Sequence, residues 1–422
     1  MTLSRTRELL AGAPAFRLIL LATLGSGIGT WLAVIALAVD IFDRTGSGVW
    51  VGALLMADFL PAVVVGLLLG PLLDRLSRRR LMIGSDLVRA AVFIVLPFTG
   101  SAYAVVALAA IAGFATGFFR PAALAALPNL VADDALEKAN SLYQTVENLT
   151  TALAPVAAGG LVAAFGTDVA YGTNAASFLV SAALIARIAP SSFQGEKPVT
   201  KGHWRDLREG FEVVLRTRAL LAVLIAWTMI GVLANAGVNV AEIFLAQESY
   251  GAGDLGFGLL VAASGAGAVL GSILASPALR GRPINLVYGV SIALMGVGAL
   301  AAAVSPTIWL GMVGAFVLGL GNGSAVVCNI LLVQRSTVDA VRGRVFTLLH
   351  SSTWVFLGLG MLAAGTLTDI LGPRWVWGIA SVFSFLAAAV GYRLTRGFGT
   401  DGKPPSVRPV DVEPAPMTGA GH

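Results

Sequence analysis

Charged residues are scarce in this sequence. Only 12% of its 422 residues are Asp, Glu, Lys or Arg, and 57% are hydrophobic, whereas a soluble domain carries about 25% charged residues. This composition excludes a soluble globular protein and predicts a polytopic membrane protein. A net charge of +5 would suggest a nucleic-acid partner in a soluble chain. A membrane protein needs basic loops for its orientation, so we predict no nucleic-acid role.

The residues that build metal, redox and nucleotide sites are also scarce. Cys328 is the only cysteine and lies in an apolar run, which excludes an intrachain disulfide and a cysteine-based metal site. His350 stands alone, and a lone histidine makes no metal site. The glycine-rich strings at 265–271 and 319–323 lie in apolar segments and lack the lysine of a phosphate-binding loop. We therefore expect no metal, no cofactor and no enzymatic activity.

Long apolar runs, by contrast, recur along the whole chain. A helix of about 20 residues crosses ~30 Å of hydrocarbon, and runs of that length are separated here by charged or turn-forming residues. They predict twelve membrane spans, at 16–41, 49–73, 81–99, 102–130, 141–164, 168–188, 219–246, 255–278, 284–303, 306–333, 344–369 and 373–393. The first run is too long for a signal-peptide core, so we expect it to be retained.

Basic residues indicate how these spans are oriented. Arg44 and Arg374 fall on one side, Arg89, Arg120 and Arg187 lie within spans, and all other Lys and Arg fall on the side of the two chain ends. Lys and Arg mark the cytoplasmic side of a membrane protein. We therefore predict a multi-pass protein of the cell (inner) membrane with both termini in the cytoplasm.

The same runs predict the domain organisation. Residues 1–189 and 219–396 would each form a six-helix half, joined by a cytoplasmic linker at 190–218 and followed by a disordered tail at 397–422. In the linker, apolar residues recur at helical spacing between charged ones over 204–215. This pattern is typical of an amphipathic helix that lies along the membrane surface.

A short basic loop separates the second and third spans. Its sequence, GPLLDRLSRRR at 70–80, places an acid where the second span ends and arginines where lipid excludes them. It resembles the loop between helices 2 and 3 of the major facilitator superfamily, G-x-L-x-D-R-x-G-R-[RK], with Ser77 in a glycine position. The resemblance implies a conformational latch, in which Asp74 accepts hydrogen bonds from the start of span eleven. The latch residues would be Gly70, Asp74, Arg75, Arg78 and Arg79.

Two further features support this resemblance. An offset of 206 residues places Gly159 on Gly365 and Gly166 on Gly372, as expected for the parallel six-span repeat of the superfamily. In addition, the segment APVAAGG at 154–160 is similar to the G-P-x-x-G-G kink of drug-exporting branches, with alanines in glycine positions. Pro155, Gly159 and Gly160 are therefore candidates for a hinge, or for ordinary small-residue packing. The run at 40–47 resembles the macrolide-efflux and siderophore-exporter branch of drug:proton antiporters.

Ionisable residues within spans are costly, so each is a functional candidate. Asp58 lies near the middle of span two, where an unpaired carboxylate would either bind a proton or meet a cation. Glu147 and Arg120 lie at a similar depth in spans five and four, and would form either a structural ion pair or a coupling pair. For Asp86 and Arg89, three residues apart, the simplest expectation is that they pair with each other or with the Arg78 loop.

Polar residues in span seven form a stripe. Asn235, Asn239 and Glu242 follow at i, i+4 and i+7 and share one helix face. In the superfamily, spans one, four, seven and ten line the central cavity, so the resemblance places this stripe beside the substrate together with Asn322. Interhelical hydrogen bonding without a ligand is the alternative. Glu242 is also the next candidate for proton exchange. Aromatic candidates for the cavity walls are Trp31, Phe118, Phe119 and Trp227; the alternative for each is a lipid-facing or interfacial position.

These features predict a twelve-helix all-α transporter of the major facilitator fold that exports small amphipathic molecules in exchange for protons. We expect a monomer in the lipid bilayer. The alternatives on the same fold are a lysophospholipid or lipid flippase and a siderophore or metabolite exporter. An integral membrane enzyme or a non-transporting sensor is the alternative of another class.

Overall fold

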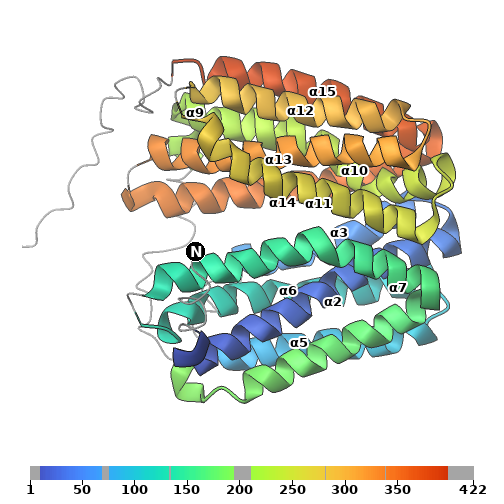
Figure 1. Cartoon of the computed structure of the whole chain (residues 1–422), viewed down its shortest axis with the longest axis vertical. Helices are drawn as coiled ribbons and strands as arrows, with labels where there is room; N and C mark the ends of the chain where they lie inside the picture. The colour runs from blue at the N-terminus through green and yellow to red at the C-terminus, as the bar shows by residue number, and fades with distance from the viewer. Residues whose placement is uncertain are drawn as a thin grey trace, which may run out of the picture.

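The computed structural model describes residues 10–68, 76–132, 135–193, 211–280, 282–337 and 339–397. The helices of the first half pack together as one bundle (Figure 1): α2 (Pro14–Thr45), α3 (Gly48–Leu68), α5 (Arg78–Val95) with the 3-10 turn η1 (Leu96–Phe98), α6 (Ala102–Ala126) with η2 (Leu127–Asn129), and α7 (Leu136–Ala186). A 3-10 turn, η4 (Pro190–Phe193), follows.

The second half forms a second bundle beside the first (Figure 1). Its first membrane helix is continuous but changes winding, through α9 (Arg218–Leu221), the π-helix η5 (Ala222–Val232), α10 (Leu233–Phe244) and the π-helix η6 (Leu245–Ser249). The remaining helices are α11 (Gly253–Ala278), α12 (Ile284–Val304), α13 (Ile308–Ser336), α14 (Asp339–Leu371) and α15 (Pro373–Leu394). Within this bundle α13 packs against α11 and α12, and α15 packs against α12 and α10.

The count of twelve membrane helices is confirmed. Within the described ranges, ten stretches are long and apolar enough to span a membrane, and Gly48–Pro61 is a shorter apolar helix. The long helix α7 turns at Gly166, whose φ of 80° lies in the left-handed region that glycine tolerates, so it contains two spans. Gly372, which the half-chain offset pairs with Gly166, has a φ of 83° between α14 and α15. The two positions that the repeat predicts to be equivalent therefore make the same turn.

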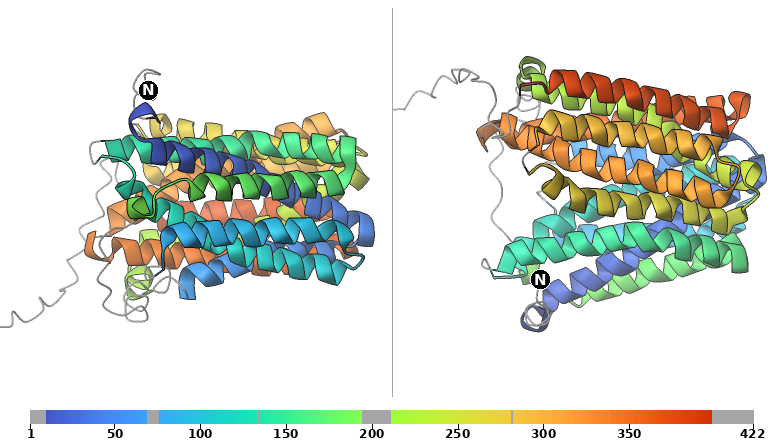
Figure 2. Two further views of the ribbon diagram at one scale, coloured as in Figure 1. Left: turned by 90° about the horizontal axis from the view of Figure 1, so that it is seen from below. Right: turned by 45° about the horizontal axis from the view of Figure 1, so that its top comes forward.

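The two bundles meet at one end of the molecule. We call the end where α2 begins and α15 ends the termini face, and the end where α2 and α14 finish the opposite face (Figures 1 and 2). Near the opposite face α3 packs against α14 and α7 against α11. A Cβ added to Gly48 would lie 2.7 Å from the Gly365 carbonyl oxygen, and one on Gly159 would lie 2.8 Å from that of Asp254. These glycines allow backbones of the two bundles to touch.

The two arginines that sit on the opposite face have structural partners. Arg44 donates from Nε to Asp40 at 2.7 Å and from Nη1 to the Thr99 carbonyl at 2.8 Å. Arg374 donates to the carbonyls of Ala303 and Ser305 at 2.8 and 2.6 Å. Each arginine therefore connects one end of a helix to a neighbouring segment. This structural role explains why these two basic residues occur on the opposite face, where basic residues are few.

Some sequence predictions fall outside the described residues. This is the case for Gly70, Asp74 and Arg75 of the latch motif, for residues 194–210 of the linker and for the tail beyond 397. Residues 211–216, the end of the expected linker helix, are helical. Arg79 donates to the carbonyls of Ile188 at 3.1 Å and Ala186 at 2.6 Å, so it ties the start of α5 to the end of α7. Arg78 also has an interaction partner.

Candidate functional site

Two adjoining cavities lie in the interior of the molecule. One, of about 400 Å³, is lined mainly by the first bundle, and the other, of about 800 Å³, mainly by the second. Arg120 of α6 and Trp354 of α14 line both cavities. Because these two residues come from different bundles, the cavities meet at the boundary between the bundles.

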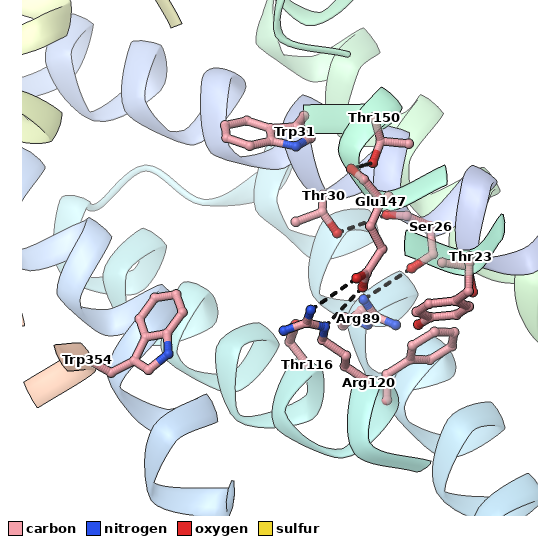
Figure 3. Close-up of a pocket in the computed structure, with 13 residues that line it drawn as sticks. Thr23, Ser26, Thr30, Trp31, Arg89, Thr116, Arg120, Glu147, Thr150 and Trp354 are labelled. Carbon is pink, nitrogen blue, oxygen red and sulfur yellow. Dashed lines mark hydrogen bonds and ion pairs between the residues drawn. The ribbon is translucent and has the colours of Figure 1, made fainter. Parts of the chain in front are cut away.

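The smaller cavity contains a charged pair that joins α6 to α7. Arg120 donates from Nε and Nη2 to the two carboxylate oxygens of Glu147, each at 3.0 Å (Figure 3). This bidentate geometry is the strong form of such a pair. The side chain of Arg120 is 55% exposed and that of Glu147 is 22% exposed, so the pair lies at the cavity surface. The sequence left a structural pair and a coupling pair open, and the contact itself is now established.

A second pair, buried beside the same cavity, confirms the expected partnership of Asp86 and Arg89. Arg89 donates to Asp86, which is fully buried and also accepts from Ser181 Oγ at 2.6 Å. The Arg89 guanidinium lies 4.1 Å from the centre of the Phe178 ring, and the Nε atom has no partner among the described residues. Asp58 is near enough to Arg89 for electrostatic attraction, and its backbone packs on α6, but it lines neither of the two cavities.

The larger cavity combines apolar walls with a few polar groups. The predicted stripe of α10 lies here, together with Asn322 of α13 and Trp227 of η5. Its lining residues that bear most on function are Arg120, Trp227, Asn235, Asn239, Glu242, Asn322, Asn329, His350 and Trp354. Ser264, Thr353 and a majority of valine, leucine, isoleucine, methionine and phenylalanine side chains complete the wall. Such a site suits a molecule with a large apolar part and few polar groups.

The polar stripe leaves acceptor atoms unused. The Nδ2 of Asn235 donates to the Gly231 carbonyl at 2.8 Å and to Ser384 Oγ at 3.0 Å. These two acceptors fix the orientation of the amide, so its Oδ1 remains, and this atom has no partner in the described part of the chain. The same holds for Oε1 of Glu242, whose side chain is buried. Buried oxygens without donors are costly.

The aromatic predictions have different outcomes. Trp31 and Phe119 line the smaller cavity and Trp227 the larger one. Phe118 lines neither of the two cavities, and packs edge-on against Phe114 with ring centres 5.2 Å apart. Adjacent residues of a helix point about 100° apart, and here Phe118 is directed to Phe114 while Phe119 is directed to the cavity.

Sequence reasoning missed three of the residues named above for the larger cavity, namely Asn329, His350 and Trp354. Asn329 follows Asn322 by seven residues and therefore shares its helix face, a signal that was available. Trp354 had no such signal, because its role depends on tertiary contacts. Its indole donates to His350 Nε2 at 2.9 Å, and its ring stacks on Phe59 of α3 with centres 5.6 Å apart. Trp354 thus lies across the boundary between the bundles (Figure 3).

The predicted hinge segment lies at the contact between the bundles. Pro155 and Gly159 on α7 face Gly258 on α11, where a Cβ added to Gly258 would lie 2.5 Å from the Pro155 carbonyl oxygen. Gly160 has more room, since its added Cβ would meet only Leu255 at 3.9 Å. The small residues here permit close approach of a neighbouring helix, as expected; a pivoting role stays a prediction.

The sequence is similar to those of known transport proteins. The family model described as Major Facilitator Superfamily matches residues 19–283 and 228–419. The multidrug efflux pump Tap of Mycobacterium tuberculosis is 27% identical over 383 residues, which cover 85% of this chain and 88% of Tap. Macrolide efflux protein A of Streptococcus pyogenes is 21% identical over 350 residues, covering 81% and 86% of the two chains.

A solved structure shows the same fold. The chain superimposes on a bacterial homologue of the human lysosomal transporter Spinster, in an inward-facing and unoccupied conformation, with a TM-score of 0.72. Sequence identity is 15%, and the match covers 96% of this chain and 100% of that chain. At this identity the likeness bears on the fold alone.

Proposed function

The chain belongs to the Major Facilitator Superfamily, and we propose that it exports small amphipathic molecules in exchange for protons. The observation that carries this proposal is the cavity of about 800 Å³ at the boundary of two bundles whose close backbone contacts lie near one face. A rocking of the bundles would close the termini face and open the opposite face, as in alternating access. The substrate class follows from the apolar walls and from the drug-efflux relatives.

Proton coupling rests on the acids inside the spans. Glu242, Asp58 and Glu147 are the candidate proton carriers, and Arg120 would modulate Glu147 through their ion pair. Glu242 combines burial, an unpartnered oxygen and a place in the larger cavity. A chain of this family that moves substrates against a gradient needs an ion gradient as its energy source, and buried carboxyls are suited to carry protons.

The orientation proposed from the basic residues places the termini face in the cytoplasm of the cell (inner) membrane, with the protein acting as a monomer. A single cysteine at Gly402 in a Cys328→Ala background should then resist membrane-impermeant thiol reagents in intact cells. Rapid labelling from outside the cell would show that the orientation is the opposite of the one proposed.

Transport itself is tested in proteoliposomes that contain the purified full chain. An imposed pH gradient should drive accumulation of amphipathic drugs from a panel of cationic dyes, macrolides, siderophores and lysolipids. Accumulation of lysolipids or siderophores alone would favour the flippase or siderophore-exporter alternative. A panel in which the gradient drives no compound would refute proton-driven export.

A further inference from the structure

We propose that Trp354 determines the size of the substrate, because its indole separates the two cavities and confines a ligand to one of them. The protein then selects compact amphipathic molecules and discriminates against bulky ones that would have to occupy both cavities. This inference rests on the proposed export function and specifies its substrate class. Three observations support it: the place of Trp354 between the cavities, the contacts that fix its side chain, and the different chemistry of the two cavities.

Trp354 and Arg120 reach the boundary between the cavities from opposite sides. Among the described residues that line the smaller cavity, Trp354 is the only one that belongs to the second bundle (Figure 3). Among those that line the larger cavity, Arg120 is the only one that belongs to the first bundle. Each of these two side chains therefore extends from its own bundle to the cavity of the other, and together they narrow the connection between the cavities.

The Trp354 side chain is fixed on two sides. Its indole N–H donates to Nε2 of His350, one turn earlier on α14, at 2.9 Å. Its ring also stacks on Phe59 of α3, with ring centres 5.6 Å apart and an angle of 28° between the ring planes. Turning the indole aside to admit a larger ligand would break the hydrogen bond and the stack together. Trp354 therefore acts as a rigid wall, because packing and a hydrogen bond both hold its rotamer.

Arg120 is held on the other side of the boundary by its bidentate pair with Glu147, in which both contacts measure 3.0 Å. A bidentate pair restricts the orientation of the guanidinium as well as its position. Replacing Arg120 would remove this partner of the Glu147 carboxylate, so the charge of the cavity would change together with its shape. Trp354 is uncharged, so its replacement opens the boundary and leaves the charge of both cavities unchanged.

The two cavities differ in chemistry and in volume. The smaller, of about 400 Å³, contains hydroxyl groups in addition to its ion pair; they belong to Thr23, Ser26, Thr30, Thr116, Tyr143 and Thr150. The larger, of about 800 Å³, is mainly apolar. Each volume falls within the ~300–1,000 Å³ of sites for drug-sized ligands, whereas the joined space would exceed this range. A molecule that occupied both cavities would need a large apolar body and a polar appendage, and the indole excludes such molecules.

Phe59 connects this wall to the conformation of the transporter. It lines neither of the two cavities, so it acts on a ligand through Trp354 and is a positioning residue. Its helix α3 packs against α14 across the bundle boundary, and these two helices would separate when the opposite face opens. The wall is therefore fixed while the termini face is open, which is the state in which the proposed exporter takes up its substrate.

The test compares the binding of ethidium, a compact planar cation, with that of erythromycin, a bulky macrocycle that carries sugar rings, to the purified full-length protein in detergent. Equilibrium dialysis gives both dissociation constants, and their ratio measures size selection. Trp354→Ala should raise the affinity for erythromycin relative to ethidium by at least about tenfold, the lower end of the discrimination by shape that an apolar pocket achieves. Phe59→Ala should shift the ratio in the same direction but less, because the hydrogen bond of Trp354 to His350 remains.

Two other tryptophans provide matched controls, since each lines only one of the two cavities: Trp31 the smaller and Trp227 the larger. Their replacement by alanine removes the same side chain without joining the cavities. Neither variant should therefore show the gain in relative affinity for erythromycin. An equal gain in Trp31→Ala or Trp227→Ala would show that added room, rather than the wall at Trp354, sets the size limit, and would overturn the inference.

A second variant keeps the test decisive if Trp354→Ala does not fold. Trp354→Leu also removes the ring but keeps an apolar side chain that can pack against Phe59, and thermal unfolding shows which variant is intact. A ratio that is unchanged in the intact Trp354 variant and in Phe59→Ala would overturn the inference and leave the export function intact, because the parent protein would still bind the ligands. Failure of the parent to bind any drug of the panel would refute the proposed function, and the inference with it.

Discussion

Replacing Asp369 by asparagine should weaken one of the contacts that join the two bundles at the opposite face. Near the end of α14, the Asp369 carboxylate accepts hydrogen bonds from Ser47 Oγ at 2.8 Å, from the Gly48 backbone N–H and from the Val49 backbone N–H at 3.2 Å. These donors lie at the start of α3. A helix start carries unpaired N–H groups and a partial positive charge, so a carboxylate is well suited to bind it.

The free-energy change caused by Asp369→Asn follows from the negative charge that the substitution removes. Asparagine keeps an acceptor oxygen but removes the negative charge, which is worth about 1 kcal/mol at an exposed helix N-terminus. Because the bonds cross between bundles, they must break whenever the opposite face opens. The substitution should therefore shift the equilibrium toward opening of this face by about fivefold, and less at high salt, since the contact is solvent-exposed.

Spin labels can follow this shift. Phe165 on α7 and Ile370 on α14 are both exposed near the opposite face, and labels there would report the distance between bundles in a Cys328→Ala background. Asp369→Asn should enlarge the long-distance population relative to the parent. Asp168→Asn is the matched control, because it removes a carboxylate on the same face that lies near Arg44. If Asp369→Asn and Asp168→Asn gave the same distance distribution, the carboxylate would not hold the bundles together.

Three further predictions concern the bundle contact, the buried ion pair and the basic loop. Gly159→Ala should impair transport because its Cβ would press on backbone of α11, whereas Gly160→Ala should be nearly neutral in the same transport assay. Asp86→Asn should destabilise the protein by about 3–5 kcal/mol by leaving Arg89 buried and unpaired, and thermal unfolding that matches the parent would contradict this. Asp74→Asn should slow transport while preserving substrate binding, as expected of a latch; unchanged transport would indicate a surface carboxylate without that role.

The sequence was sufficient for the helices and for part of the site. Span length and charge distribution depend on the local chain, so the twelve membrane helices could be predicted. The half-chain offset also predicted that Gly166 and Gly372 occupy equivalent positions, and both lie at turns between helices. The polar stripe of span seven was also predictable, because i, i+4 and i+7 share a face in any helix. The depth of a residue in the membrane could also be predicted, because it follows from the position of that residue along its span.

What the sequence could not supply was the rotation of each helix about its axis and the contacts between bundles. Phe118 and Phe119 were equivalent candidates, and only the packing of α6 shows that Phe119 faces the cavity. Trp354 reaches Phe59 across the bundle boundary, and Asp369 reaches the start of α3. Both contacts join residues about 300 positions apart in the chain, a separation over which a periodicity in one segment carries no information.

The measurement that tests the central claim most directly is transport of ethidium by proteoliposomes with and without an imposed pH gradient. Export in exchange for protons predicts that the pH gradient drives accumulation of ethidium and that dissipating the gradient abolishes this accumulation. Accumulation of ethidium that does not depend on the pH gradient would contradict the account.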